Sequence, residues 1–362
     1  MRIVQVVHSF YPAIGGIEQH VYHLSKELVK QGHEVIVHTT GKGKGEIDGV
    51  TVKYHWALNL PFFSSVNLSP GLVLSLLRER ADVFASHGYG STMPYWTALV
   101  AWLKGKPFVF TLHGYPRLRG VEGIFQWFYK IFIASIFLRI AKKIIIVSRA
   151  TERDIEKEAD ARKIAYIPNG VSGVFFQIKK QKSNAIAYIG RFDRYKRIDM
   201  LIEAFAEVKK EFPELELTLI GRDEGIRAEL EAAAKRAGVE VLFGEAKPDD
   251  MPQLYSQLKA VVLPSAYEGF SLVWLEAIAS QRVVFSTPVG EAPELFANAY
   301  GKDADKFLFR DTQELVSKLR GFLENEKAYE KTVAAARATV KTGYSWKTVA
   351  ERTLKTYRGL LD

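Results

Sequence analysis

Two glutamates eight residues apart mark the segment with the clearest chemical character, Glu268–Glu276 (EGFSLVWLE). Ser271 is a favoured N-cap residue, so we expect a helix to begin at Leu272. The amides of Phe270, Ser271 and Leu272 would then point out of a helix N-terminus, which suits phosphate. Glu276 could accept hydrogen bonds from ribose hydroxyls, and Glu268 could hydrogen-bond a sugar or stabilise an oxocarbenium-like centre. Taken singly, the two acids also fit a helix-dipole partner and an exposed loop acid.

Two cations follow the predicted strand 185–189 in the segment Gly190-Arg191-Phe192 and at Lys196. Glycine frees the turn. Cations just past a strand end can hold a diphosphate, arginine through its planar fork and lysine as a point charge. They would also stabilise the charge of a departing nucleoside diphosphate without a metal ion. Taken alone, the segment also fits an exposed basic turn.

Two further features lie at predicted strand ends in the first half. Gly15-Gly16 would let backbone N–H groups approach an anion near a helix N-terminus. The turn is not GxGxxG, and the second strand ends in Thr39-Thr40 without a ribose-binding acid, which argues against a nicotinamide oxidoreductase. His113 could donate to a sugar hydroxyl or to developing charge, although a lone histidine is more often structural.

The composition excludes several classes of site. The chain of 362 residues has no cysteine, so disulfides, zinc–cysteine sites, iron–sulfur clusters and thiol nucleophiles are ruled out. No His, Asp or Glu cluster has metal-ligand spacing, and there is neither a P-loop nor a nucleophile elbow. The lack of cysteine, with few Met, Asn and Gln, hints at a thermophilic source.

The charge is distributed unevenly. Residues 1–182 carry 24 Lys and Arg against 13 Asp and Glu, whereas residues 183–362 carry 26 against 28. A basic half suggests an anionic partner such as a phospholipid surface or a polyprenyl phosphate, and solvated surface lysines explain it equally well. No nucleic-acid-binding motif accompanies the charge, so we expect no nucleic-acid partner.

The apolar segment 124–146 has two interpretations. Charged residues interrupt it, so no transmembrane span is expected. We favour a buried helix followed by the strand 143–147. Its surplus of aromatic residues also fits a helix that contacts a membrane. No targeting peptide is visible, so we expect a cytoplasmic protein, with peripheral attachment to the inner face of the cell membrane as the alternative.

Alternation of short apolar runs with helical patterns predicts an α/β protein built from two doubly wound, Rossmann-like domains facing across a cleft. We expect the first domain at 1–178, the second at 185–342 and a final helix at 343–362 that crosses back to the first domain. The expected strands of the first domain are 3–7, 34–39, 51–55, 83–86, 108–112 and 144–147. Those of the second are 186–189, 216–220, 240–243, 260–263 and 283–286.

Together these residues resemble retaining glycosyltransferase family 4 (glycosyl transferases group 1), which has the GT-B fold. Residues 268–276 match its E-x7-E signature, and residues 190–196 match its G-R-[FL]-x3-K element. Residues 15–18 (GGIE) and 31–35 (QGHEV) look like its opening, and residues 167–171 (IPNGV) resemble a mid-chain landmark. Gln281 and Arg282 depart from its usual G-x-P pattern, and Glu291 stands where a second glycine is common.

The resemblance implies a role for each matching position. Gly16 would approach the donor phosphates through its backbone, and Arg191 and Lys196 would bind the diphosphate. Glu276 would bind the ribose and Glu268 the transferred sugar. His113 would be the active-site histidine near the C6 hydroxyl of the sugar.

The resemblance therefore implies an enzyme that transfers a hexose, with retention, from a UDP-, GDP- or ADP-sugar. No further cofactor is required, and Mg²⁺ could assist the diphosphate although no protein ligand set demands it. The basic first half favours a lipid-linked or other anionic glycan acceptor at the membrane surface. The alternatives are a nucleotide-sugar epimerase of the same fold and a soluble transferase that makes a free glycoside.

Overall fold

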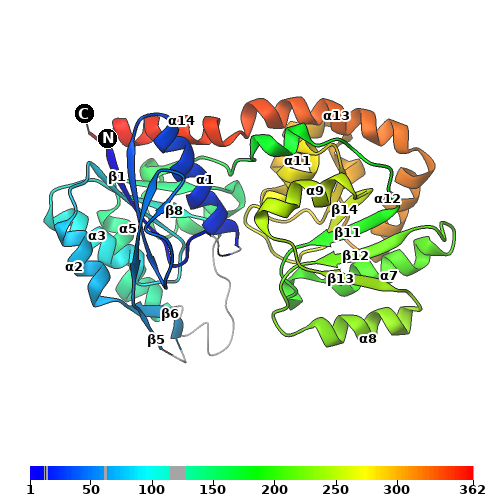
Figure 1. The fold of residues 1–362 in the computed structure, drawn as a ribbon, viewed down its shortest axis with the longest axis horizontal. Coiled ribbons are helices and arrows are strands. Elements are labelled where there is room, and N and C mark those ends of the chain that lie inside the picture. The colour runs from blue at the N-terminus through cyan, green and yellow to red at the C-terminus, as the bar shows by residue number, and fades with distance from the viewer. Residues whose placement is uncertain (12, 14, 61–62, 115–126, 362) are drawn as a thin grey trace. The chain divides into compact units, whose positions relative to one another are not determined.

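The computed structural model describes residues 1–11, 13, 15–60, 63–114 and 127–361, and the statements below concern these residues. The chain forms two compact units. Unit 1 comprises Met1–Gly170 and Trp346–Asp362, and unit 2 comprises Val171–Ser345. Each unit is an α/β structure with its own largely parallel sheet, as the sequence predicts (Figure 1).

The sheet of unit 1 has eight strands in the order β10-β9-β8-β7-β1-β2-β4-β3, and among the described residues its antiparallel neighbours are β3 and β4. Its strands are β1 (Arg2–Val6), β2 (Glu34–Thr40), β3 (Glu46–Ile47), β4 (Val50–His55), β7 (Val83–His87), β8 (Phe108–Leu112), β9 (Lys143–Ile146) and β10 (Ile164–Tyr166). A separate antiparallel pair is formed by β5 (Leu58–Leu60) and β6 (Phe63–Leu68).

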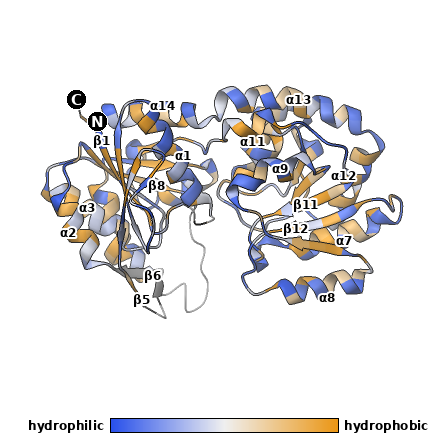
Figure 2. Ribbon diagram, viewed as in Figure 1, coloured by the Kyte–Doolittle hydropathy of each residue, from blue (hydrophilic) through white to orange (hydrophobic). Residues whose placement is uncertain are grey.

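Helices cover both faces of this sheet (Figure 1). They are α1 (Gly16–Lys30), α2 (Pro70–Arg78), α3 (Met93–Leu103), α5 (Ser135–Ile140), α6 (Glu152–Ile155) and α14 (Trp346–Arg358), with the π-helical segment η1 (Lys130–Ala134) and the short 3₁₀ helices η2 (Arg149–Thr151) and η3 (Ala161–Lys163). The central strands are buried on both sides, so they are almost continuously apolar, and Figure 2 shows this hydrophobic colour along them.

The sheet of unit 2 has five parallel strands in the order β13-β12-β11-β14-β15. They are β11 (Ala185–Ile189), β12 (Glu216–Ile220), β13 (Val241–Gly244), β14 (Ala260–Leu263) and β15 (Val283–Ser286). Its helices are α7 (Ile198–Lys209), α8 (Arg227–Ala237), α9 (Met251–Ser256), α10 (Leu272–Ala279), α11 (Ala292–Tyr300), α12 (Thr312–Glu324) and α13 (Glu326–Gly343), with turns η4 (Gly173–Gln177), η5 (Arg194–Lys196), η6 (Pro248–Asp250) and η7 (Gly301–Phe307).

The units divide at Gly170–Val171, whereas the sequence analysis places the end of the first domain at residue 178. The backbone N–H of Val171 donates to the carbonyl of Tyr344 (2.8 Å), and the ring of Phe175 packs edge-on against Tyr255. Segment 171–178 is therefore held by unit 2. The final helix begins at Trp346, which packs so closely on Gly170 that an added Cβ would lie 2.7 Å from the indole.

The sequence predicts a buried helix followed by a strand for segment 124–146, and in the described residues from 127 onward the helix and the strand β9 are present but only the second half of the helix is buried. Residues 127–140 are helical, but their first half exposes large apolar side chains while Ala134, Phe137 and Leu138 are buried. Lys130 is held by an ion pair with Glu158 (3.0 Å). The exposed side chains are Trp127, Phe128, Ile131 and Phe132. Residues 124–126 lie outside the described residues.

No helix among the described residues is both long enough and apolar enough to cross a bilayer.

Gln281 adopts the backbone conformation for which the glycine that is usual at this position is better suited. It follows Ser280, the C-cap residue of α10, and has φ 56°, in the left-handed region that disfavours residues with a Cβ. We predict that Gln281→Gly raises the free energy of unfolding by about 1 kcal/mol, measured by urea denaturation. Gly238, at φ +69° with open space around it, is the matched position, and Gly238→Ala should lower stability by a similar amount. A destabilised Gln281→Gly would contradict this account.

Candidate functional site

The strand order of unit 2 creates an opening for a ligand. From β11 the chain proceeds outward through β12 to β13, then returns to the other side of β11 and continues through β14 to β15. Loops leaving the carboxyl ends of β11 and β14 therefore diverge, and such a reversal point is where open α/β sheets bind ligands. Segment 190–196 follows β11, and segment 264–271 follows β14.

An ion pair joins these two loops. The Lys196 ammonium contacts the carboxylate of Glu268, and both side chains are largely buried. The same carboxylate accepts a hydrogen bond from Ser265 Oγ (3.2 Å), and the backbone N–H of Ala266 donates to the carbonyl of Tyr195 (2.7 Å). The residues that the sequence singles out from separate motifs are thus brought into direct contact.

Arg191 lies at the same strand end, but its side chain is more exposed and less closely paired than that of Lys196. Its side chain is 58% exposed, and its guanidinium is 3.7 Å from the carboxylate of Asp193. The carbonyl of Arg191 accepts a hydrogen bond from the hydroxyl of Tyr188 (2.8 Å), which fixes the backbone of the turn after β11. The backbone is therefore fixed while the cationic group stays accessible to an anion.

Two glycines allow the neighbouring loops to approach one another. Gly290 has φ +57°, and a Cβ there would lie 2.4 Å from the carbonyl oxygens of Glu268 and Gly269. Glu291, at the position where a second glycine is common, donates its backbone N–H to the carbonyl of Gly269 (3.0 Å). Gly221 faces the carbonyl of Gly190 in the same way. Residues 268–269 are therefore packed directly against residues 290–291, and residue 190 is packed against residue 221.

Helix α10 begins at the predicted position. Ser271 is its N-cap residue, with extended backbone, but its hydroxyl makes no capping hydrogen bond. The side chain of the N-cap residue therefore does not close this helix end, and the N-terminus of a helix carries the positive end of its dipole, which suits an anion. Phe270 does not face solvent, because its ring packs against Trp274.

Glu276 is held by a residue that the sequence does not single out. The hydroxyl of the buried Tyr255 donates to Glu276 Oε2 (2.9 Å). Burial raises the pKa of Glu276 to about 7, and the tyrosine hydrogen bond opposes that rise. Tyr255 is itself anchored by Arg282, whose Nε donates to its carbonyl (2.7 Å). Only a tertiary contact identifies this tyrosine, which lies on α9, far from both motifs.

The raised pKa of Glu276 links the site to stability. Below pH 4.5 the carboxyl is protonated in both the folded and the unfolded chain; above it the unfolded chain loses the proton first, so stability falls as pH rises toward 7. We predict that Glu276→Gln is more stable than the wild type at pH 8, by about 2 kcal/mol after allowing for partial exposure, and equal near pH 4.5. Urea unfolding at both pH values measures the difference, and identical pH dependence of the two proteins would contradict it.

In unit 1 the sequence-predicted glycine turn caps α1. Gly15 is the N-cap residue, and a Cβ on it would meet the carboxylate of Glu18, which hydrogen-bonds Ser9. A Cβ on Gly16 would meet nothing within 4 Å. A Cβ on Gly16 would thus enter open space at the N-terminus of α1, and a Cβ on Gly15 would require only the flexible side chain of Glu18 to move.

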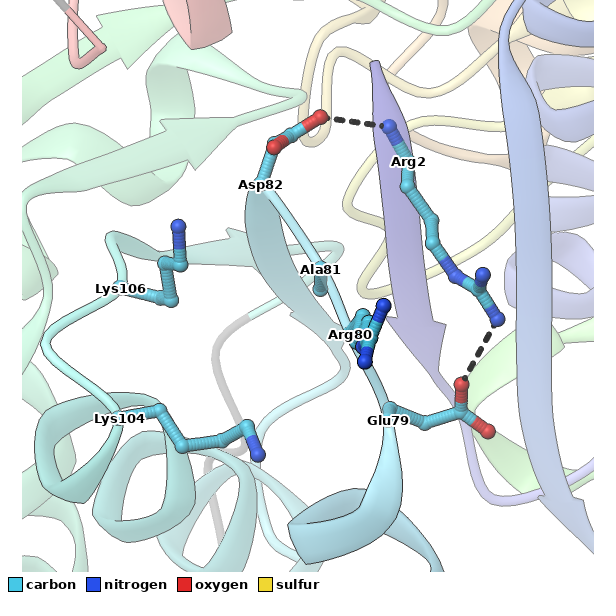
Figure 3. A pocket seen from close by; sticks show the side chains of 7 residues that line it. All are labelled: Arg2, Glu79, Arg80, Ala81, Asp82, Lys104 and Lys106. Atoms are coloured by element: carbon cyan, nitrogen blue, oxygen red, sulfur yellow. Dashed lines mark hydrogen bonds and ion pairs between the residues drawn. The ribbon is translucent and has the colours of Figure 1, made fainter.

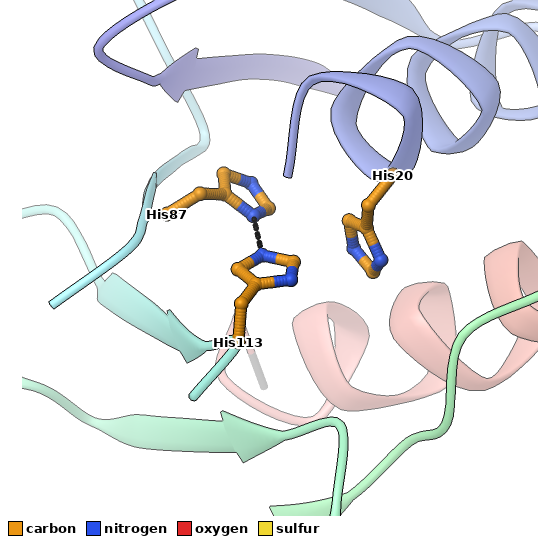
Figure 4. Close-up of side chains that lie close together, drawn as sticks. All are labelled: His20, His87 and His113. Carbon is orange, nitrogen blue, oxygen red and sulfur yellow. Dashed lines mark hydrogen bonds between the residues drawn. The ribbon is translucent and has the colours of Figure 1, made fainter. Parts of the chain in front are cut away.

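His113 belongs to a cluster of three histidines. It follows β8, His87 ends the neighbouring β7, and His20 lies on α1, and their ring nitrogens lie within 4.8 Å of one another (Figure 4). From the sequence we find no metal-ligand spacing, but the fold brings together these three potential ligands, which come from distant segments of the chain. The signal that selects His113, a histidine at the carboxyl end of a parallel strand, also applies to His87.

One pocket of about 540 Å³ in unit 1 lies at the opposite edge of its sheet (Figure 3). Its lining residues precede or begin strands: Arg2, Glu79, Arg80, Ala81, Asp82, Lys104 and Lys106. The backbone N–H of Arg2 donates to Asp82 (2.8 Å), and its guanidinium donates to Glu79 (3.3 Å). Ligands in such sheets bind at the carboxyl ends of strands, so this pocket is not the candidate site.

Comparison with known families decides what this arrangement is. Residues 14–172 match the family model described as Glycosyltransferase Family 4, and residues 174–339 match the one described as Glycosyl transferases group 1. The chain belongs to glycosyltransferase family 4. It is therefore a glycosyltransferase with the two-sheet GT-B fold.

Curated relatives and solved structures match nearly the whole chain. The GPI3 subunit of phosphatidylinositol N-acetylglucosaminyltransferase from Saccharomyces cerevisiae is 25% identical, covering 99% of this chain and 83% of the relative. The glycogen synthase of Mycobacterium tuberculosis is 25% identical, covering 99% and 94%. Among solved structures, Anabaena Alr3699/HepE in complex with UDP has a TM-score of 0.81 at 21% identity, covering 99% and 100%.

Proposed function

We propose that this glycosyltransferase moves a hexose, with retention of anomeric configuration, from a UDP-sugar to a lipid acceptor with an anionic headgroup at a membrane surface. Unit 2 acts as the donor domain and unit 1 as the acceptor-side domain. The observation that carries the donor half is the joining of the two family motifs through the Lys196–Glu268 contact at the reversal point of the second sheet.

The donor is assigned to the residues around this contact. Arg191 and Lys196 bind the diphosphate, because an exposed guanidinium and a neighbouring ammonium present a fork and a point charge to it. The amides of Phe270, Ser271 and Leu272, at the N-terminus of α10, supply donors to phosphate oxygens, and Glu276 accepts from the ribose hydroxyls. UDP is the preferred nucleotide because solved structures of similar fold contain UDP and UDP-glucose.

From unit 1, Gly16 offers its backbone to the diphosphate, and its open surroundings support that role. His113 contacts the transferred sugar. Glu268 faces the same sugar, but its carboxylate is already engaged by Lys196 and Ser265. A carboxylate held in that way is a poor nucleophile, which favours departure of the nucleoside diphosphate, with its charge stabilised by the cations, over a covalent glycosyl intermediate.

The acceptor assignment is supported by exposed side chains on the surface of unit 1. An aromatic patch, defined as Trp127, Phe128, Ile131 and Phe132, exposes between 43% and 60% of each side chain. Phe128 and Phe132 stack, with ring centroids 6.0 Å apart. The first half of the chain also carries an excess of Lys and Arg, and exposed aromatic side chains on a basic protein are typical of surfaces that contact anionic membranes. Relatives whose names include phosphatidylinositol support an inositol phospholipid as the acceptor.

The donor assignment predicts loss of nucleotide binding in Lys196→Ala. With UDP at 100 times its dissociation constant, the wild type should be stabilised by about 2.7 kcal/mol in a thermal-shift titration. The variant should lose most of this gain, because the diphosphate loses a charged partner.

Lys259→Ala is the matched control. Lys259 is also largely buried and paired with a glutamate, Glu326, but lies away from the reversal point. It should retain the full response to UDP. Stabilisation by GDP or ADP in place of UDP would overturn the nucleotide assignment. Equal stabilisation of the Lys196→Ala and Lys259→Ala variants by UDP would show that Lys196 has a structural role and does not bind the nucleotide.

The acceptor assignment predicts that the double variant Phe128→Ser/Phe132→Ser binds anionic liposomes at least about tenfold more weakly than the wild type, because two apolar side chains no longer enter the interface. Leu242→Ser removes an exposed apolar residue of unit 2 and should leave binding unchanged. Co-sedimentation with vesicles of phosphatidylcholine and phosphatidylinositol measures this. Transfer from labelled UDP-glucose or UDP-N-acetylglucosamine into a soluble glucan, with none into lipid, would replace this function by that of a soluble transferase.

A further inference from the structure

Buried polar groups behind His113 define which of its two nitrogens carries a proton. His87 Nε2 lies 2.8 Å from Gln5 Oε1, and Gln5 Nε2 donates to Ser25 Oγ (2.8 Å). Gln5, Ser25 and His87 are buried. With its Nε2 group donating to Ser25, the glutamine amide presents its oxygen to the imidazole. An amide oxygen only accepts hydrogen bonds, and therefore His87 Nε2 is the protonated nitrogen.

The proton positions then propagate to His113. His87 Nδ1 lies 3.2 Å from His113 Nε2 (Figure 4). In a neutral His87 with a proton on Nε2, Nδ1 carries a lone pair and must accept. His113 Nε2 is consequently the donor, and His113 Nδ1 carries the remaining lone pair. Within the described residues no group hydrogen-bonds to that nitrogen.

We propose that Gln5 and His87 are positioning residues, which hold His113 in its Nε2–H tautomer and present Nδ1 as a hydrogen-bond acceptor to a hydroxyl group of the transferred sugar. This inference rests on the proposed function, because it places His113 at the sugar. It assigns His113 the role of acceptor, whereas the sequence suggests a donor.

The surroundings keep the histidines neutral, as the proposal requires. Burial lowers the pKa of His113 and of His87 well below the usual value, and the proximity of His20 lowers both further. His20 is itself fixed, with Nδ1 2.8 Å from Asn169 Oδ1, and its ring packs edge-on against His113 with centroids 4.5 Å apart. A neutral imidazole has one donor and one acceptor, so fixing one nitrogen fixes the other.

The strand order explains why these groups meet. β8, β7 and β1 are adjacent, and His87 ends β7 directly beside β8, where Thr111 is its partner in the ladder. Gln5 pairs with Ala85 across β1 and β7. The row of polar side chains therefore runs across three neighbouring strands, from the buried side of β1 to the carboxyl end of β8.

The tautomer can be read directly in the full-length protein. Histidine labelled with ¹⁵N reports the protonation of each ring nitrogen through its chemical shift and its couplings to ring protons. In the wild type at pH 7, His113 should be protonated at Nε2 and bare at Nδ1. A wild-type His113 protonated at Nδ1 would overturn the proposal, and this readout is independent of any transferase activity.

Variants separate positioning from packing. Gln5→Met keeps the volume but removes the acceptor, and His87→Leu removes both hydrogen bonds. Each should yield a mixture of His113 tautomers and lower kcat/KM for the UDP-sugar about three- to tenfold, the range for one neutral hydrogen bond. The dissociation constant of UDP, which lacks the sugar, should stay unchanged. His87→Asn places an amide oxygen near the former Nδ1 and should restore the tautomer and activity to within about twofold.

Controls keep the outcomes distinct. His38 and His55 form another close imidazole pair (3.0 Å) in unit 1, and His55→Gln should alter neither the His113 signals nor kcat/KM. The tautomer signals are recorded with EDTA and again with Zn²⁺, because three imidazoles could instead ligate a metal. Tight zinc binding that abolishes the wild-type signal pattern, or an unchanged tautomer in both Gln5→Met and His87→Leu, would overturn the proposal. The expected tautomer in a protein that fails to bind any UDP-sugar would disprove the proposed function and, with it, the sugar contact, while leaving the hydrogen-bonded row intact.

Discussion

Reversal of strand order beside the first strand of each sheet is the constraint on which the rest of the structure depends. In unit 1 the chain runs from β1 to β2 on one side and later to β7 and β8 on the other; in unit 2 it runs from β11 to β12 and later to β14 and β15. Parallel strands place all their carboxyl ends at one edge, so the loops that part at each reversal carry the polar side chains. Gly16, His87 and His113 lie at one such edge, and Lys196 and Glu268 lie at the other.

Placing polar groups at these edges costs stability, and the packing beneath them compensates. Glu276 resists ionisation because it is buried, yet Tyr255 holds it in place, and Arg282 holds Tyr255 from behind. Arg282 is only 1% exposed, and burial lowers its pKa to about 10. A buried arginine at a position where the family pattern differs thus supports, through Tyr255, the carboxyl group of Glu276. Deviations from a family pattern can therefore move a structural task to another residue without changing the site.

The two units treat their titratable groups differently. In unit 2 the titratable groups of the candidate site are charged, since Lys196 and Glu268 form an ion pair. In unit 1 the imidazoles are kept neutral by burial, and directed hydrogen bonds order their protons.

Local sequence determined most of the architecture. Apolar runs located the central strands, with β8, β12, β14 and β15 at the expected residues, because strands buried on both faces must be continuously apolar. Motif spacing located the candidate site and the family. Tertiary structure alone decided that Tyr255 supports Glu276, that Gln5 and His87 lie behind His113, and that Phe128 and Phe132 are exposed rather than buried. The reason is physical: strand periodicity and helix caps depend on neighbours within a few residues, whereas these contacts join segments that only the order of strands in the sheet brings together.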